Sequence, residues 1–249
     1  MNSYLKNLNR IEFVVTMACT GKCKHCSQGD HNSTEQLDKS LCADAVRKIA
    51  SEYNIQSVMT FGGEPLLCPD TVYEIHKAAK ELCIPKRQLI TNGYFSRDFN
   101  NIRSVAQRIA ESGVNEILLS VDAFHQETIP LEYVKAFAEA VKEAGVSIKV
   151  QPAWLVSPNA ENIYNNKTKE ILKNFNAMGI EENEGNIIWP SGNALKYLSE
   201  YFNLSKEQKS PYEEDPKDIR AICFSANGDI LKNNIYEKDI LKILEEYKV

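Results

Sequence analysis

Short apolar runs rich in β-branched residues alternate with longer amphipathic stretches along most of the chain. The runs with strand character lie at residues 11–16, 56–61, 87–91, 116–121, 147–155 and 186–189. Between them, as in residues 72–82 and 131–141, apolar side chains recur every three or four positions, the period of a helix with one buried face. Six strand–helix units predict a parallel sheet covered by helices, either a partial barrel or a doubly wound sheet.

The pattern changes after Phe202. The charged, proline-containing residues 205–218 predict a surface linker, and Asn227-Gly228 predicts the turn of a β-hairpin before a helix from about Glu237. We therefore divide the chain into a barrel of residues 1–204 and a small C-terminal extension of residues 205–249.

Composition limits the kinds of partner. The 249 residues carry a net charge of -5 and no block rich in Lys and Arg, which argues against binding to nucleic acid or a membrane surface. The apolar run near the N-terminus contains Glu12 and is too short for a signal peptide or a membrane span, so we expect a cytoplasmic protein. Seven cysteines in such a protein are expected to be reduced, some of them as metal ligands.

Three of these cysteines, Cys19, Cys23 and Cys26, lie within eight residues directly after the first predicted strand. A structural zinc ion takes four protein ligands, so His25 or His31 would complete a zinc site. A [4Fe-4S] cluster instead takes thiolates, and three of them leave one iron open to another ligand. The spacing predicts a metal site and leaves both metals possible.

Polar and glycine-rich segments follow the other predicted strands: GGEP (62–65), TNGY (91–94), SVDAFH (120–125), QPAW (151–154) and PSGNA (190–194). Ligands of both candidate architectures bind at the C-terminal ends of parallel strands, so we expect these segments to surround the cysteines. The candidate substrate contacts on this rim are Tyr94, His125, Gln126, Gln151, Trp154 and Asn193.

CxxxCxxC, GGEP, TNG and Ser-x-Asp at four successive strand ends resemble the radical S-adenosylmethionine (radical SAM) superfamily. The resemblance implies an α/β fold, namely a partial (β/α)6 TIM-like barrel with a small C-terminal extension. It implies that Cys19, Cys23 and Cys26 hold a [4Fe-4S] cluster whose open iron binds SAM. One electron, with flavodoxin or ferredoxin as the expected donor, would then break SAM, and a 5'-deoxyadenosyl radical would abstract a hydrogen atom from the substrate.

The same resemblance assigns cofactor contacts. The glycines would let the backbone approach SAM, Glu64 would accept from its ammonium group, and Ser120 with Asp122 would bind its ribose or carboxylate. Tight turns, helix caps or an exposed loop histidine explain the same residues without a ligand. The predicted cofactor-binding residues are His25, Gly62, Gly63, Glu64, Asn92, Ser120 and Asp122.

The substrate is expected to be a ribosomally made peptide or a small polar molecule. A glycyl-radical activating enzyme is the alternative, although such enzymes typically carry an Asp-Leu-Lys-like strand end where this chain has LSVDAFH. A noncatalytic iron-sulfur or zinc protein is a further alternative.

Two features outside these motifs suggest further functional roles. Lys22 and Lys24 lie between the cysteines of an acidic protein, so they predict a positively charged docking site for the electron donor. Cys223 has no cysteine near it in sequence and cannot hold a second cluster. It is predicted either to donate a hydrogen atom to the substrate radical from over the barrel mouth, or to be buried as a small apolar residue.

Overall fold

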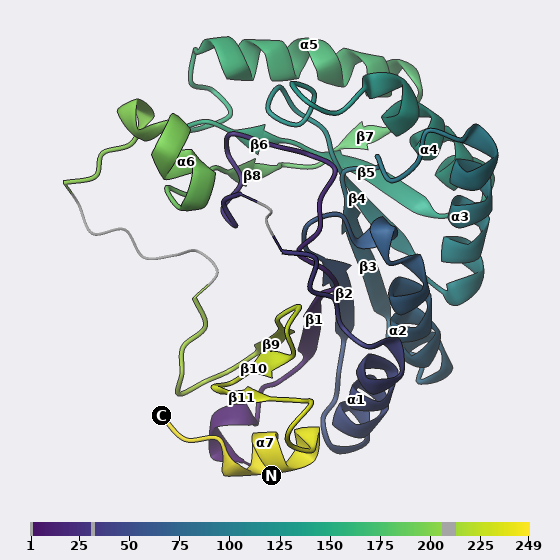
Figure 1. Ribbon diagram of the computed structural model, residues 1–249, viewed down its shortest axis with the longest axis vertical. Helices are drawn as coiled ribbons and strands as arrows, with labels where there is room; N and C mark the ends of the chain where they lie inside the picture. The colour runs from purple at the N-terminus through teal and green to yellow at the C-terminus, as the bar shows by residue number, and fades with distance from the viewer. Residues whose placement is uncertain (1, 31–32, 206–212) are drawn as a thin grey trace.

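The computed structural model describes residues 2–30, 33–205 and 213–249. Seven parallel strands form one sheet in the order β7-β5-β4-β3-β2-β1-β9. The strands are β1 (Arg10–Val14), β2 (Ser57–Phe61), β3 (Lys86–Thr91), β4 (Glu116–Ser120), β5 (Ser147–Gln151), β7 (Glu181–Glu182) and β9 (Ala221–Phe224). The sheet is curved, and its concave face is open to the left in Figure 1.

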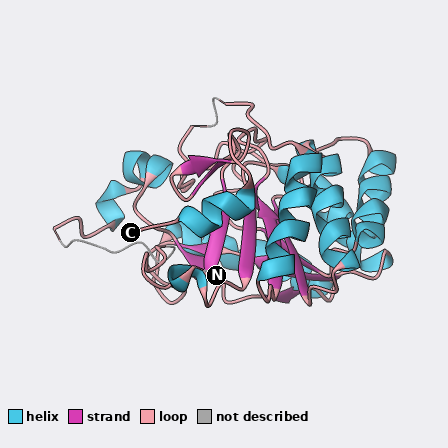
Figure 2. Ribbon diagram, turned by 90° about the horizontal axis from the view of Figure 1, so that it is seen from below, coloured by secondary structure: helices cyan, strands magenta, loops and turns pink. Residues whose placement is uncertain are grey.

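Five long helices pack along the outer, convex face of the sheet (Figures 1 and 2). They are α1 (Lys39–Glu52), α2 (Pro69–Glu81), α3 (Phe99–Ser112), α4 (Leu131–Glu143) and α5 (Ile163–Ala177). The short α6 (Gly192–Tyr197) follows β7, so six strand–helix units are present and the predicted partial (β/α)6 barrel is confirmed. Among the described residues, no helix combines the length and the apolar character needed to cross a bilayer.

The predicted sixth strand at residues 186–189 is only partly right. The sixth strand of the barrel is β7, which consists of two exposed glutamates and therefore has no apolar pattern to reveal it. The apolar run instead begins with β8 (Asn186–Ile187), which pairs with β6 (Ala153–Trp154) in a separate two-stranded sheet. Ile188 then packs into a small second core with Phe124 and Leu155.

The barrel strands present two different faces. Their outward side chains are buried against the helices, as Phe13 of β1 shows by stacking on Phe224 of β9 with 4.7 Å between ring centroids. Their inward side chains form rows across the concave face. The strand register defines a middle row of Val14, Phe61, Ile90, Leu118 and Lys149. Below it, toward the N-terminal ends of the strands, lies a floor row of Cys223, Glu12, Met59, Gln88 and Glu116.

The C-terminal segment is built into this sheet. The predicted turn at Asn227-Gly228 is present, since the Gly228 N–H donates to the Ser225 carbonyl at 2.8 Å and the Ser225 N–H to the Asp229 carbonyl at 2.9 Å. The strand before the turn, β9, however pairs in parallel with β1. The hairpin that forms joins β10 (Asp229–Ile230) to β11 (Asn233–Asn234) through Leu231 and Lys232, both with positive φ. The helix α7 (Ile240–Glu246) then packs near α1, where Lys48 and Asp239 pair at 2.6 Å.

Candidate active site

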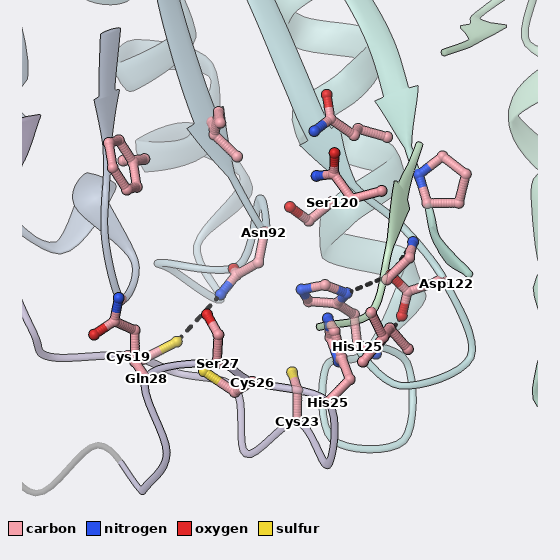
Figure 3. Close-up of a pocket in the computed structure, with 18 of the residues that line it drawn as sticks. Cys19, Cys23, His25, Cys26, Ser27, Gln28, Asn92, Ser120, Asp122 and His125 are labelled. Carbon is pink, nitrogen blue, oxygen red and sulfur yellow. Dashed lines mark hydrogen bonds and ion pairs between the residues drawn. The ribbon is translucent and has the colours of Figure 1, made fainter. Parts of the chain in front are cut away.

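A pocket opens at the C-terminal ends of the strands and is lined by Cys19, Cys23 and Cys26 (Figure 3). The loop after β1 carries the three cysteines, and the tips of β2 to β5 and the segment after β8 form the other walls. The predicted convergence of the strand ends is therefore present in the structure.

The three thiols fit a [4Fe-4S] cluster with one iron free of protein ligands. Their sulfur atoms lie along one wall of the pocket (Figure 3), and no other cysteine among the described residues lines it. Burial raises the pKa of Cys19 to about 11 and also raises that of Cys23, so both thiols stay protonated until a metal displaces the proton. His31, one of the possible zinc ligands, lies outside the described residues.

The GGEP segment holds the start of the cysteine loop. The backbone N–H groups of Gly63 and Glu64 donate to the carbonyls of Thr16 and Ala18, each at 2.8 Å. A Cβ atom on Gly63 would lie 2.2 Å from the Ala18 carbonyl oxygen, and one on Gly62 would lie 2.6 Å from that of Thr16. Both glycines line the pocket, but the structure explains their small size by contact with this loop rather than with a ligand.

Glu64 has a different role from the predicted contact with SAM. Its carboxylate is completely buried outside the pocket lining. It accepts from the Thr91 hydroxyl at 2.7 Å and from the backbone N–H groups of Leu66 and Asn92 at 2.9 and 2.8 Å. Burial raises the pKa of Glu64 to about 7. The side chain thus ties the tip of β2 to the tip of β3.

Asn92 connects β3 to the cysteine loop. Its side-chain amide lies 3.7 Å from the Cys19 sulfur and 3.3 Å from the Thr20 hydroxyl, while its oxygen accepts from the Tyr94 N–H. Hydrogen bonds to the ligand sulfurs help set the reduction potential of iron-sulfur clusters. Asn92 is therefore placed to affect a bound cluster as well as a ligand in the pocket.

Asn193, predicted as a substrate contact, holds the loop from the opposite side. It is nearly buried, its backbone N–H donates to the Cys26 carbonyl at 2.9 Å, and its side chain donates to the Cys23 carbonyl at 3.3 Å. Gly192 packs so closely that a Cβ there would lie 2.5 Å from the Ser27 carbonyl oxygen. Turn-forming residues mark PSGNA in the sequence, but nothing in it indicates this distant partner.

Asp122 lines the pocket, and four protein donors already surround its buried carboxylate. One oxygen accepts from the N–H groups of Phe124 and His125, both at 2.9 Å. The other contacts His125 Nδ1 at 2.8 Å and accepts from the Ala153 N–H at 3.0 Å. Burial alone would raise the pKa of Asp122, but His125 and the backbone donors outweigh it and hold this pKa below its usual range. Ser120 lines the pocket as predicted.

His25 lies against two rings at the pocket wall. Its ring centroid is 5.0 Å from that of Phe124 and 4.8 Å from that of His125. Its Nδ1 is buried and has no hydrogen-bond partner among the described residues, and burial lowers its pKa to about 4. Figure 3 shows His25 and His125 beside Cys23.

Residues 13–156 match the model of the radical SAM superfamily. The chain belongs to this superfamily. Its cofactors are accordingly a [4Fe-4S] cluster and SAM, as the motifs predicted. This chain is 27% identical over 143 residues to a probable GTP 3',8-cyclase of Methanococcus maripaludis, and the match covers 56% of this chain and 45% of the relative. It is 24% identical over 177 residues to the GTP 3',8-cyclase of Clostridium perfringens, covering 65% and 51%. The chain thus spans about half the length of these curated relatives.

Solved structures of radical SAM enzymes share the fold. Streptococcus suis SuiB bound to S-adenosylmethionine superimposes with a TM-score of 0.62 at 16% identity, covering 98% of this chain and 66% of SuiB. The anSMEcpe structure with AdoMet and the Cp18Cys peptide superimposes with a TM-score of 0.59 at 14% identity, covering 96% and 80%.

The remaining candidate substrate contacts do not all lie in the pocket. His125 and Gln151 line the pocket, whereas the Trp154 indole donates to the Glu184 carbonyl and Gln126 accepts from the Asp122 N–H. Tyr94 stacks on Tyr133.

Cys223 lies exposed on the edge strand β9 beside Glu12, in the floor row and not over the mouth.

Proposed function

We propose that this radical SAM enzyme abstracts a hydrogen atom from a peptide or small polar substrate bound against the concave face of its barrel. Cys19, Cys23 and Cys26 hold the cluster, and the bound cluster and SAM supply a 5'-deoxyadenosyl radical. The observation that carries the proposal is the convergence of the three thiols on a pocket whose lower wall, Phe61 and Ile90, belongs to the middle row of that face.

The chemistry of the pocket supports a substrate without a polyphosphate. Among the described residues, its lining contains no lysine or arginine, and its polar groups include the uncharged Ser27, Gln28, Gln151 and Asn186. The barrel strands place three cations on the concave face, and each is paired: Arg10 with Glu12 at 2.5 Å, Lys86 with Glu116 at 3.6 Å and Lys149 with Glu181 at 4.0 Å. A nucleoside triphosphate is normally bound by free cationic side chains. GTP, the substrate named for the curated relatives, is therefore disfavoured relative to a neutral polar chain.

The rows of the concave face suggest how a substrate is positioned. The apolar residues Val14, Phe61 and Ile90 separate the pocket from the floor row and would keep water from the reacting carbon. Cys223 lies two residues further down the strands, about 7 Å below this row. A substrate lying across this middle row would have the adenosyl group above it and the Cys223 thiol below it. We therefore retain Cys223 as the hydrogen-atom donor in this proposal. The thiyl radical left on Cys223 would return to the thiol by taking one electron from the flavodoxin or ferredoxin and one proton from water.

Electron delivery is proposed to occur at the outer side of the cysteine loop. Lys22 is exposed there, whereas Lys24 pairs with Glu127 at 3.1 Å and contributes less net positive charge than the sequence predicts. The proposed donor is an acidic flavodoxin or ferredoxin. Lys22→Glu should slow turnover driven by flavodoxin and leave turnover driven by dithionite unchanged, while equal loss with both reductants contradicts this dock.

The test of the proposed function is anaerobic reconstitution followed by assay of 5'-deoxyadenosine. The wild type should bind about four irons per chain and cleave SAM after reduction. Replacing Cys19, Cys23 and Cys26 with Ala should abolish both, whereas Cys83→Ala, an exposed cysteine outside the pocket, should change neither. Cleavage that survives in the triple variant would refute the proposal. Incubation with GTP and with candidate peptides, followed by mass spectrometry, tests the substrate class.

A further inference from the structure

We propose that Cys23, His25 and His125 form a second metal site, for a divalent ion of the Zn²⁺ class. Cys23 is also one of the three cluster cysteines, so the ion and the cluster would exclude each other. This inference goes beyond the proposed function, because it concerns the chain before a cluster is assembled.

The ligand set is brought together by the fold. The metal-binding atoms of Cys23, His25 and His125 all lie within 4.8 Å of one another. Ligand atoms around a zinc ion are about 3.5 Å apart, given bond lengths of about 2.0 to 2.3 Å in tetrahedral geometry. Small side-chain rotations would therefore close the site. A zinc ion held by one thiolate and two imidazoles keeps its fourth coordination position open for an exchangeable ligand.

His125 is already oriented for this role. Its Nδ1 contacts the Asp122 carboxylate at 2.8 Å, which leaves Nε2 as the nitrogen available to a metal. Asp122 is itself fixed by the backbone N–H groups of Phe124, His125 and Ala153. A carboxylate that holds the far nitrogen of a histidine is the usual second partner of a zinc ligand.

His25 supplies an independent observation. Its Nδ1 is buried without a hydrogen-bond partner among the described residues, and an unpaired buried polar atom is costly. The contacts with Phe124 and His125 restrict the ring to the neighbourhood of Cys23. A metal ion between the three residues would remove the cost of this unpaired nitrogen.

The consequence is a distinct state of the cluster-free chain. This site uses one cysteine, whereas the zinc alternative predicted from sequence uses three with His25 or His31. An ion at Cys23 would have to leave before the cluster is assembled. Zinc should therefore slow cluster assembly in the wild type, and this inhibition should depend on both histidines.

The site can be tested with Co²⁺ on the cluster-free full-length chain. The Cys19→Ala/Cys26→Ala double variant cannot hold the cluster but keeps all three proposed ligands. It should bind one Co²⁺ with a sulfur-to-cobalt charge-transfer band, and X-ray absorption should report one sulfur and two imidazole ligands. Cys23→Ala should lose the band. His25→Ala and His125→Ala should each weaken binding at least 100-fold, and Asp122→Asn should weaken it about 10- to 100-fold.

Two results would overturn the site. Co²⁺ binding that disappears in the double variant would place the ion on the three cysteines, and binding unchanged in His25→Ala or His125→Ala would remove the histidines from the ligand set. If the histidine variants do not fold, the ligand count in the double variant decides between these outcomes. Assembly of the cluster in wild type, with and without one equivalent of Zn²⁺, is measured in parallel. Cluster assembly is scored by iron content and by 5'-deoxyadenosine, independently of the cobalt measurements. Failure of the zinc site therefore does not contradict the proposed function.

Discussion

The two ends of the barrel strands use their polar side chains differently. At the C-terminal rim, Glu64, Asp122 and Asn193 each hold another loop in place through several hydrogen bonds. In the floor row, Glu12 and Glu116 pair with neighbours on the same sheet face, and Cys223 is exposed. A motif residue at the rim is thus frequently a support for neighbouring segments, while the floor leaves the Cys223 side chain exposed to a substrate. Substitutions that disturb this difference should have effects on the protein that decrease from the rim to the floor.

The largest effect is expected for Gly63→Ala. The added Cβ would lie 2.2 Å from the Ala18 carbonyl, and this backbone contact has no flexible side chain that can move away. The cysteine loop should be displaced, and reconstituted protein should contain little iron while keeping its far-UV circular dichroism. Gly145→Ala is the control, because φ is positive there and strains the backbone of an alanine, while the added Cβ meets open space. That variant should lose about 1 kcal/mol of stability and keep its iron. Equal iron content in the two variants would contradict the role of Gly63.

A second large effect is the pH dependence contributed by Glu64. A folded-state pKa near 7 exceeds the usual value, so the folded chain binds the proton more tightly than the unfolded chain. Its stabilising contribution is present below about pH 4.5 and is lost as the pH rises to about 7, by about 3 kcal/mol. Urea unfolding of wild type and Glu64→Gln across this pH range isolates the contribution of Glu64 to the free energy of unfolding. The free energy of the wild type should fall relative to that of the variant as the pH rises, and parallel curves would refute the assignment.

An intermediate effect is expected for Asn193→Ala, with Asn165→Ala as its control. Both asparagines are buried, but Asn165 binds carbonyls of Leu155, Ser157 and Ala160 in its own loop. Each variant should lose about 1–3 kcal/mol of stability. Only Asn193→Ala should also change the electron paramagnetic resonance spectrum of the reduced cluster, because only Asn193 donates to the Cys23 carbonyl. The same spectral change in both variants would assign it to general loosening of the fold.

The smallest change in stability is expected for Cys223→Ala. The side chain is exposed, so the loss should stay within about 0.5 kcal/mol. The product should change instead: SAM cleavage should continue, but the substrate radical should no longer acquire a hydrogen atom from the thiol. In deuterated water the wild type should place solvent deuterium in the product. A variant that still makes the same deuterated product would exclude Cys223 as the donor.

The sequence reveals more of the fold than of the site. The first five barrel strands match their apolar runs because each buries one face against helices, and the rule for parallel strands correctly gathers their tips. The sixth strand has no such pattern, since Glu181 and Glu182 are exposed at the edge.

The roles of Glu64, Asp122 and Asn193 could not be predicted in the same way. The partner of a buried polar side chain depends on which distant segment packs against it. Local sequence identifies the residue as unusual, but its hydrogen bonds extend to residues up to 170 positions away. The identity of the motif is therefore easier to predict than the direction of its contacts.

The pairing of β9 with β1 has a consequence for how the barrel is made. The N–H groups of Asn9 and Arg10 donate to the Arg220 carbonyl, so one side of the strand that leads into the cysteine loop is completed by residues synthesised much later. Until then β1 is an edge strand with unpaired backbone groups, a position prone to pairing with other chains. Pairing so distant in sequence is also slow to form. A nascent chain would therefore carry its metal-binding thiols for some time beside an incomplete sheet, when protection by a chaperone is most useful.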